Sequence, residues 1–106
     1  MISEPDFSNT VSVEVRGAVH WLTLNRPDSL NAITTEMATE LGDYFGGLAR
    51  DRHCRIVVMR GAGRAFCAGL DIKRRGEGEK PFGGGFGFQG LLADVYLKMH
   101  HCPQPI

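Results

Sequence analysis

Residues 64–73, which follow shortly after the apolar run 56–59, constrain the fold and chemistry of this chain most strongly. The apolar run predicts a strand, and the small residues and glycine after it lead into a helix-like start. Because small side chains leave backbone N–H groups accessible, a ligand oxygen can reach those groups. N–H groups in the first turn of a helix also carry partial positive charge. The stretch therefore predicts a pocket wall of main-chain donors, suited to a developing oxyanion.

Composition bounds the class of protein. The chain has 106 residues, the size of one small domain or a piece of a larger one. Its hydrophobic fraction of 42% is enough for a core. Twelve basic residues balance twelve acidic ones, so the charge predicts no nucleic acid partner. We interpret residues 1–10 as a polar leader that is no secretory signal, and we expect no membrane-spanning segment.

The three cysteines, Cys54, Cys67 and Cys102, are odd in number and stand at unrelated spacings. We therefore expect reduced thiols and a cytoplasmic location rather than a disulfide framework. No Cys-x-x-Cys or His-x-x-x-His pair accompanies them, so we expect no metal site. No histidine in the surrounding motif can activate Cys67, and packing is the role we expect for it. His20, in a predicted strand, is interpreted as a structural or surface residue rather than an acid/base group.

The first part of the chain is typical of a β-hairpin. Valine alternates with polar residues over 11–15, the period of a half-buried strand. A turn at 17–18 and a second strand over 19–24 complete an antiparallel pair. The segment 25–29 has the proline and Asx content of a loop.

A helix and a further strand are predicted next. Thr34 or Thr35 can cap the helix, which we expect to fray near Arg50 or Asp51. One apolar stripe at helical spacing predicts its buried face: Met37, Leu41, Phe45 and Leu48. The charge-bounded apolar run 55–60 predicts the following strand. The order strand, helix, strand favours a crossover with parallel pairing, and hence an α/β fold.

Residues 76–90 contain seven glycines and are interpreted as a mobile loop. Three phenylalanines within the segment argue against a passive linker, because exposed aromatic side chains usually mark a surface that binds another group. Apolar residues over 91–99 then predict an amphipathic helix that faces the core and ends before Pro103.

The glycines after the second predicted crossover strand do not form a nucleotide fingerprint. Gly61 and Gly63 begin a G-x-G-x-x-G pattern, but its third glycine is replaced by Phe66. A P-loop is excluded as well, because no Gly-Lys-Ser/Thr follows.

Two blocks, residues 24–32 and residues 61–73, resemble the first two conserved blocks of the crotonase superfamily, the enoyl-CoA hydratase/isomerase family. They stand in the family's order and at its usual separation, and the resemblance covers the chain from Val11 onward. It implies a crotonase-like ββα spiral, of which residues 11–106 form the N-terminal part only. We therefore expect the chain to be a piece of a longer enzyme.

The resemblance also implies roles for individual residues. The backbone N–H of Leu70 corresponds to one half of an oxyanion hole for a thioester carbonyl, and the Ala68 carbonyl to an acceptor for the adenine amine. The remaining residues of the implied coenzyme A site are Arg26, Ser29, Leu30, Gly69, Asp71, Ile72 and Lys73. Arg26 and Lys73 have the charge that a phosphate partner needs. Asp28 is acidic where the family often has lysine.

By the same resemblance, the expected substrate is an acyl-CoA thioester, with no cofactor beyond the coenzyme A that the substrate carries. Hydration of a 2-enoyl-CoA is the leading activity, with isomerase, dehalogenase and hydrolase chemistry as relatives. The alternative is a non-catalytic acyl-CoA-binding pseudoenzyme or assembly protein. The family's second oxyanion donor and its catalytic carboxylates correspond to positions after Ile106. A homotrimer or hexamer is expected for the intact protein.

Overall fold

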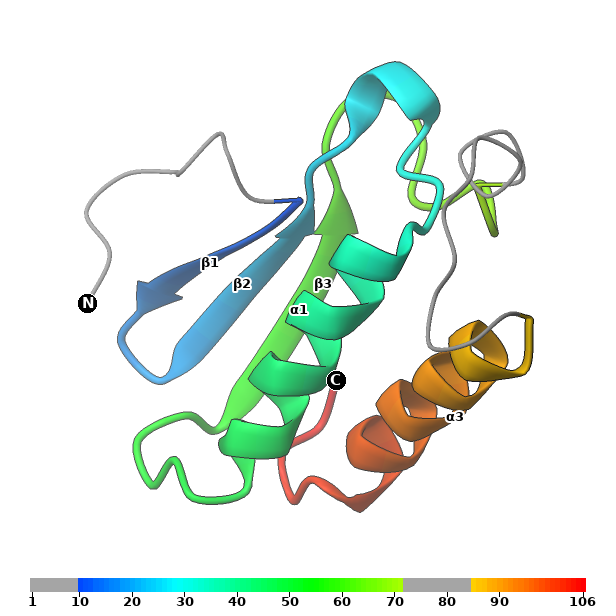
Figure 1. The fold of residues 1–106 in the computed structure, drawn as a ribbon. Coiled ribbons are helices and arrows are strands. Elements are labelled where there is room, and N and C mark those ends of the chain that lie inside the picture. The colour runs from blue at the N-terminus through cyan, green and yellow to red at the C-terminus, as the bar shows by residue number, and fades with distance from the viewer. Residues whose placement is uncertain (1–9, 72–84) are drawn as a thin grey trace.

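A computed structural model describes residues 10–71 and 85–106. Expectations for the remaining positions, including Ile72, Lys73 and the segment 76–84, lie outside the described residues. The described elements, shown in Figure 1, follow in chain order: β1 (Val11–Arg16), β2 (Val19–Leu24), the 3-10 turn η1 (Pro27–Ser29), α1 (Thr35–Leu48), β3 (Ile56–Gly61) and α3 (Gly85–His101).

The three strands form one mixed sheet in the order β1-β2-β3. β1 and β2 pair antiparallel, with Val11 opposite Leu24 and Arg16 opposite Val19. Gly17 makes the turn between them at a φ of +60°, a conformation that glycine adopts without steric cost. β3 pairs parallel to β2, beginning with Ile56 beside Val19. The predicted hairpin and the predicted parallel crossover are both confirmed.

Helix α1 covers one face of this sheet. Thr34 caps it, since its Oγ1 accepts a hydrogen bond from the Met37 N–H at 3.1 Å. The predicted apolar stripe is confirmed, and it packs with Leu22, Leu24 and Val57 of the sheet in one core. The helix ends at Leu48, slightly before the predicted fraying point.

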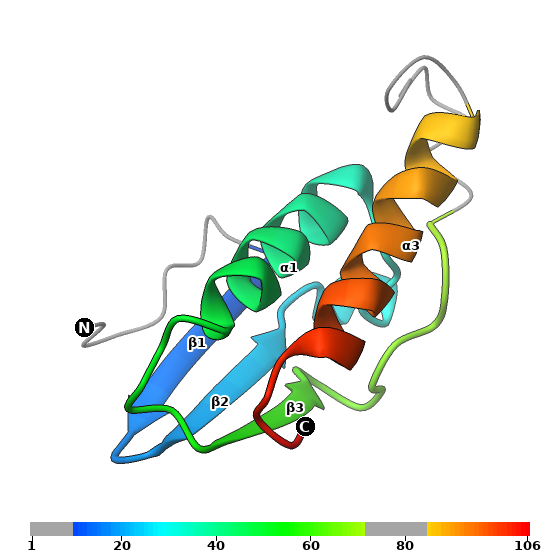
Figure 2. The same ribbon diagram turned by 90° about the horizontal axis from the view of Figure 1, so that it is seen from below.

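Helix α3 lies beside α1 on the same side of the sheet, as Figure 2 shows. Its Val95 side chain is buried, and Met99 packs against the same core. The expected loop over 76–90 is wrong for its last part, because residues 85–90 form the first turns of α3. Glycine content argued for a loop, but a helix is stabilised mainly by packing of its apolar face. Once residues 91–101 are helical and packed against α1, the helix can extend towards its N-terminus without a new nucleation step.

The segment after α3 returns to the edge of the sheet. The Gln104 side chain is buried, and its Nε2 donates to the Leu48 carbonyl at 2.9 Å and to the Asp51 carbonyl at 3.3 Å. The Pro105 carbonyl accepts from the Val57 N–H at 2.9 Å. These contacts fix residues 104–105 against the C-terminal end of α1 and the open edge of β3.

Within the described residues, no helix combines the length and the apolar character that crossing a membrane requires.

Candidate active site

Two loops meet where β2 and β3 end. Because these strands are parallel, the segments that leave them, 25–34 and 61–71, emerge at the same edge of the sheet. These segments contain the two blocks of sequence that resemble the crotonase superfamily. Figure 1 shows them together, beyond the arrowheads of the two strands. The fold therefore brings both blocks into one site.

Asn31 joins the two loops and is fully buried. Its Oδ1 accepts from the Arg26 N–H at 2.7 Å, and its Nδ2 donates to the carbonyls of Ala62 at 3.0 Å and Ala65 at 2.9 Å. Leu30 and Asn31 both have positive φ values, 52° and 58°. Asparagine tolerates this left-handed region better than most residues do. Neither the motifs nor the spacing in the sequence assign a role to Asn31, although an Asx residue in a loop is a candidate for such a backbone tie.

Two glycines shape the second loop. A Cβ at Gly61 would lie 2.3 Å from the Ala65 carbonyl oxygen and 2.7 Å from Asn31 Nδ2, so no larger residue fits there. Gly69 has a φ of +100°, and a Cβ there would meet nothing within 4 Å. Gly69 is therefore required for its backbone conformation rather than for space.

The peptide that joins Gly69 to Leu70 has a defined orientation. The Gly69 carbonyl accepts from the Ile33 N–H at 2.7 Å, and the Asp71 N–H donates to the Ile33 carbonyl at 2.9 Å. In a planar trans peptide the C=O and N–H groups point in opposite directions. Since the Gly69 carbonyl points at Ile33, the Leu70 N–H points away from it. None of the described residues accepts a hydrogen bond from that N–H, and the Leu70 residue is 37% exposed.

Other predicted site residues border the same peptide. The Ala68 N–H donates to the Leu30 carbonyl at 3.0 Å, which holds the two loops together just before Gly69. Ser29 is exposed and lies in the 3-10 turn η1, and Leu30 is half-buried. Asp28 is exposed as well. The structure thus brings Ser29, Leu30, Ala68, Gly69 and Leu70 into one neighbourhood.

Arg26 and Asp71 form an ion pair across the two loops. Arg26 Nη2 lies 2.9 Å from Asp71 Oδ2, and the two side chains are only 16% and 12% exposed. Arg26 Nη1 also donates to the Ala32 carbonyl, and Nη2 to Ser29 Oγ at 3.3 Å. Protein acceptors therefore already engage the guanidinium of Arg26. The phosphate contact that the resemblance implies for Arg26 stays a prediction. Sequence spacing gave no sign of this pair.

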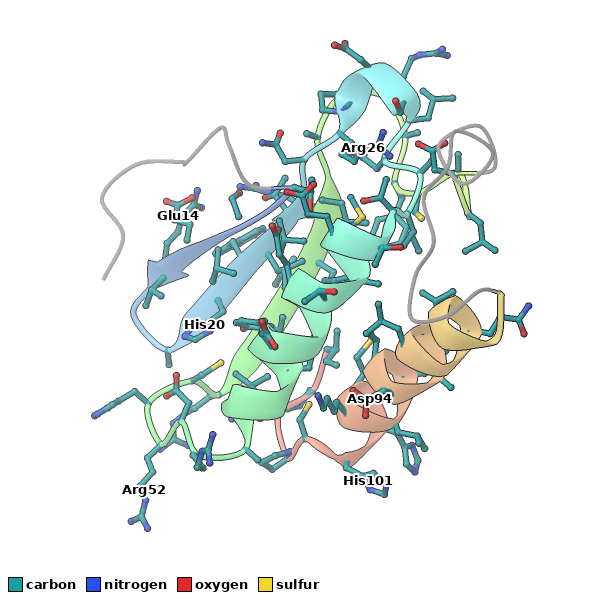
Figure 3. All side chains as sticks on the ribbon, in the orientation of Figure 1. Glu14, His20, Arg26, Arg52, Asp94 and His101 are labelled. Atoms are coloured by element: carbon teal, nitrogen blue, oxygen red, sulfur yellow. The ribbon has the colours of Figure 1, made fainter. Side chains whose placement is uncertain are left out.

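His20 lies at the opposite end of the sheet from Arg26, as Figure 3 shows. It is 8% exposed; its Nδ1 hydrogen bonds with the Tyr44 hydroxyl at 2.7 Å, and its Nε2 lies 3.7 Å from Asp51 Oδ2. Burial raises the pKa of the Tyr44 hydroxyl well above its usual value. Backbone N–H donors from Cys54 and His53 lower the pKa of the Asp51 carboxyl. Of the two roles expected for His20, structural or surface, the structure thus shows the structural one.

The cysteines are free thiols. Burial raises the pKa of the Cys54 thiol, which keeps it protonated. Cys67 packs against the hydrophobic core, in agreement with the packing role expected for it. Among the described residues, no three His, Cys, Asp or Glu side chains are grouped so that they could hold a metal ion.

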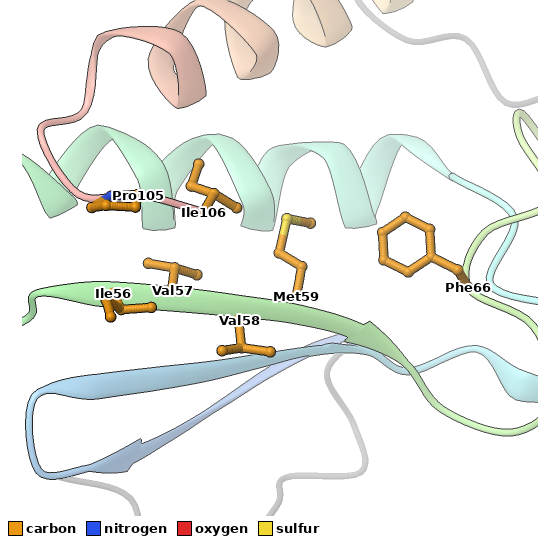
Figure 4. A pocket seen from close by; sticks show the side chains of 7 residues that line it. All are labelled: Ile56, Val57, Val58, Met59, Phe66, Pro105 and Ile106. Carbon is orange, nitrogen blue, oxygen red and sulfur yellow. The ribbon is translucent and has the colours of Figure 1, made fainter.

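An apolar pocket of about 540 Å³ lies along β3. Figure 4 shows its lining: Ile56, Val57, Val58, Met59, Phe66, Pro105 and Ile106. None of the described residues that line it has a polar or charged side chain, and Leu70 is not among them. The pocket can accept an apolar group, but it does not contain the Leu70 donor.

Comparisons with known proteins agree with this geometry. Residues 19–96 match the family model described as enoyl-CoA hydratase/isomerase. The chain is 41% identical over 88 residues to the carnitinyl-CoA dehydratase of Proteus mirabilis, covering 79% of this chain and 33% of that protein. It is 40% identical over 72 residues to 3-hydroxyisobutyryl-CoA hydrolase 1 of Arabidopsis thaliana, covering 68% and 19%.

Solved structures show the same fold. An enoyl-CoA hydratase of Mycobacterium smegmatis superposes with a TM-score of 0.80 at 36% identity, covering 91% of this chain and 37% of that one. The chain thus spans well under half the length of these relatives. The family model matches residues 19–96, which include both loops of the site, and the structural likeness covers 91% of the chain. The chain belongs to the enoyl-CoA hydratase/isomerase family, the crotonase superfamily, and corresponds to its N-terminal region.

Proposed function

We propose that the Leu70 N–H donates a hydrogen bond to the thioester oxygen of an acyl-CoA and stabilises the enolate that forms during reaction. The observation that carries this proposal is the orientation of the 69–70 peptide. Its carbonyl is held by Ile33, which turns the Leu70 N–H towards space where none of the described residues accepts it. A main-chain donor fixed in advance needs no reorganisation when charge develops on the oxygen.

The chemistry follows from that donor. Water addition across a 2,3-double bond places negative charge on the thioester oxygen, and a fixed N–H lowers the energy of that enolate. In enzymes that stabilise an oxyanion in this way, loss of one such donor lowers kcat about 10²–10³-fold. We assign the general acid and base to none of the described residues, and the lyase activity belongs to the protein as a whole.

Coenzyme A recognition is proposed for the same edge of the sheet. The Ala68 carbonyl is assigned to the adenine, and Gly69, Asp71, Ile72 and Lys73 continue the site on that side. Ser29 and Leu30, in the loop that follows β2, are assigned to the other side of the site. The names of three relatives each contain a CoA thioester. These relatives are a dehydratase, a hydrolase and the 1,2-epoxyphenylacetyl-CoA isomerase of Escherichia coli. This common element supports an acyl-CoA as substrate class.

Hydration of a 2-enoyl-CoA is the activity we propose first, because the matched family model and the superposed structures carry the hydratase name. Isomerase or hydrolase chemistry is the second candidate, favoured by the names of relatives at similar identity. A homotrimer or hexamer and a cytoplasmic location complete the proposal. Native mass and fractionation of tagged cells, respectively, measure these two properties.

The test uses the parent polypeptide, by which we mean this chain together with whatever segments accompany it in the natural protein. Crotonyl-CoA is added and the absorbance of its conjugated double bond is followed. The proposal predicts loss of that absorbance. Binding of crotonyl-CoA with unchanged absorbance and unchanged thioester would favour a non-catalytic acyl-CoA binder instead. Release of free thiol would assign hydrolase chemistry.

A further inference from the structure

The Arg26–Asp71 ion pair is withdrawn from solvent, unlike the exposed pairs of this chain. Its side chains are 16% and 12% exposed, whereas those of the Arg16–Glu14 pair are 52% and 51% exposed. Charges withdrawn from water need partners with good geometry. Arg26 has three, because its guanidinium contacts the Ala32 carbonyl and Ser29 Oγ as well as the Asp71 carboxylate. The pair is thus part of a connected network.

The network acts on the residue that follows the proposed donor. Among the described residues, the Ile33 carbonyl holds the Asp71 N–H and Arg26 holds the Asp71 carboxylate. Ile33 in turn binds the Gly69 carbonyl, which orients the 69–70 peptide. Asp71 therefore anchors the far side of the Leu70 N–H. Arg26 anchors it to the loop that follows β2.

We infer that Arg26 and Asp71 are a positioning pair that holds the Leu70 N–H in its donating orientation, and that Arg26 is not a ligand of the coenzyme's phosphates. The inference rests on the proposed function, in which the Leu70 N–H donates to the thioester oxygen. A guanidinium with 16% exposure and three protein acceptors has little freedom to turn towards a phosphate.

Kinetics of the parent polypeptide separate the two roles. Asp71→Asn and Arg26→Gln are each expected to lower kcat about 10-fold or more with KM nearly unchanged, because displacement of a reacting group slows chemistry. Arg26→Lys, which keeps one charged donor, should recover part of the loss. The double variant should be little worse than either single variant, since both remove one interaction. A raised KM with kcat preserved in Arg26→Gln would overturn the inference and assign Arg26 to phosphate binding.

Amide hydrogen exchange tests positioning without reference to activity. The Ile33 N–H is bonded to the Gly69 carbonyl, so its exchange rate reports whether the 69–70 peptide stays oriented. Asp71→Asn should speed that exchange about 10-fold or more. Glu14→Gln, which breaks the exposed pair with Arg16, is the matched control and should leave it unchanged. An unchanged Ile33 rate in a folded Asp71→Asn variant would overturn the inference, whatever the turnover. Absence of acyl-CoA turnover in the unmodified protein would instead refute the proposed function.

Discussion

At the scale of single residues, the main-chain donor of Leu70 distinguishes this site from one built on side chains. Its role can be separated from that of its side chain by two substitutions. Leu70→Pro deletes the N–H, whereas Leu70→Ala keeps it and shortens the side chain. In the parent polypeptide, Leu70→Pro should lower kcat for crotonyl-CoA about 10²–10³-fold. Leu70→Ala should stay within a few-fold of the unmodified enzyme.

Circular dichroism and acyl-CoA binding serve as controls for that comparison. Both variants must keep the far-ultraviolet spectrum of the unmodified protein, and Leu70→Pro should lose turnover more than it loses binding. Equal turnover in folded Leu70→Pro and Leu70→Ala would contradict the donor role.

Gly69 gives a second prediction at this scale. Its φ of +100° is a region that L-residues rarely adopt, so Gly69→Ala should lower the free energy of unfolding by about 1–3 kcal/mol. Gly47→Ala is the matched control, because Gly47 lies in α1 with nothing within 4 Å of an added Cβ. Alanine is the better helix former, and that change should add about 0.5–1 kcal/mol. Urea unfolding measures both, and a neutral Gly69→Ala would show that this backbone conformation is not required.

At the scale of elements, the cap of α1 fixes where the helix begins relative to the first loop. Thr34 is 1% exposed and its hydroxyl accepts from the Met37 N–H. Thr34→Ala should lower the free energy of unfolding by about 0.5–2 kcal/mol, and Thr34→Ser should lower it less. Thr39→Ala removes a hydroxyl from an exposed position of the same helix and should be near neutral. Similar losses for Thr34→Ala and Thr39→Ala would contradict the capping role.

Local periodicity predicted most of the elements because it records which face of each is buried. The valine alternation gave β1, and the stripe from Met37 to Leu48 gave α1. Residues 85–90 escaped prediction, since their helical state depends on the docking of residues 91–101 against α1. The Arg26–Asp71 pair and the Asn31 contacts escaped it too. The ion pair and the bonds from Asn31 to Ala62 and Ala65 join residues far apart in the sequence, which the parallel pairing of β2 and β3 brings together.

At the scale of the whole molecule, the Asp51 carboxyl makes stability depend on pH. Its Oδ1 accepts from the N–H groups of His53 at 2.8 Å and Cys54 at 3.0 Å, which lowers its pKa in the folded protein. A carboxyl with a lowered folded pKa stabilises the fold above its unfolded pKa, near 4 for an aspartate. That stabilisation is lost as pH falls through the lower folded pKa.

Asp51→Asn should therefore reduce the loss of stability on acidification below about pH 4, because the neutral amide does not titrate. Asp43→Asn, at an exposed position of α1, is the control and should leave the acid limb unchanged. Thermal unfolding between pH 2 and pH 6 measures the difference. If Asp51→Asn loses as much stability below about pH 4 as the unmodified protein does, the role of the Asp51 carboxyl is contradicted.

The orientation of the Leu70 amide can be observed directly in the parent polypeptide labelled with ¹⁵N. Acetyl-CoA carries a thioester carbonyl and coenzyme A does not, so the two ligands differ at the group that the amide is proposed to bind. Saturation with acetyl-CoA should shift the resonance of the Leu70 amide proton downfield, because a new hydrogen bond has that effect. Coenzyme A alone should leave this chemical shift nearly unchanged. An amide that responds equally to both ligands, or to neither while acetyl-CoA is bound, would contradict the account.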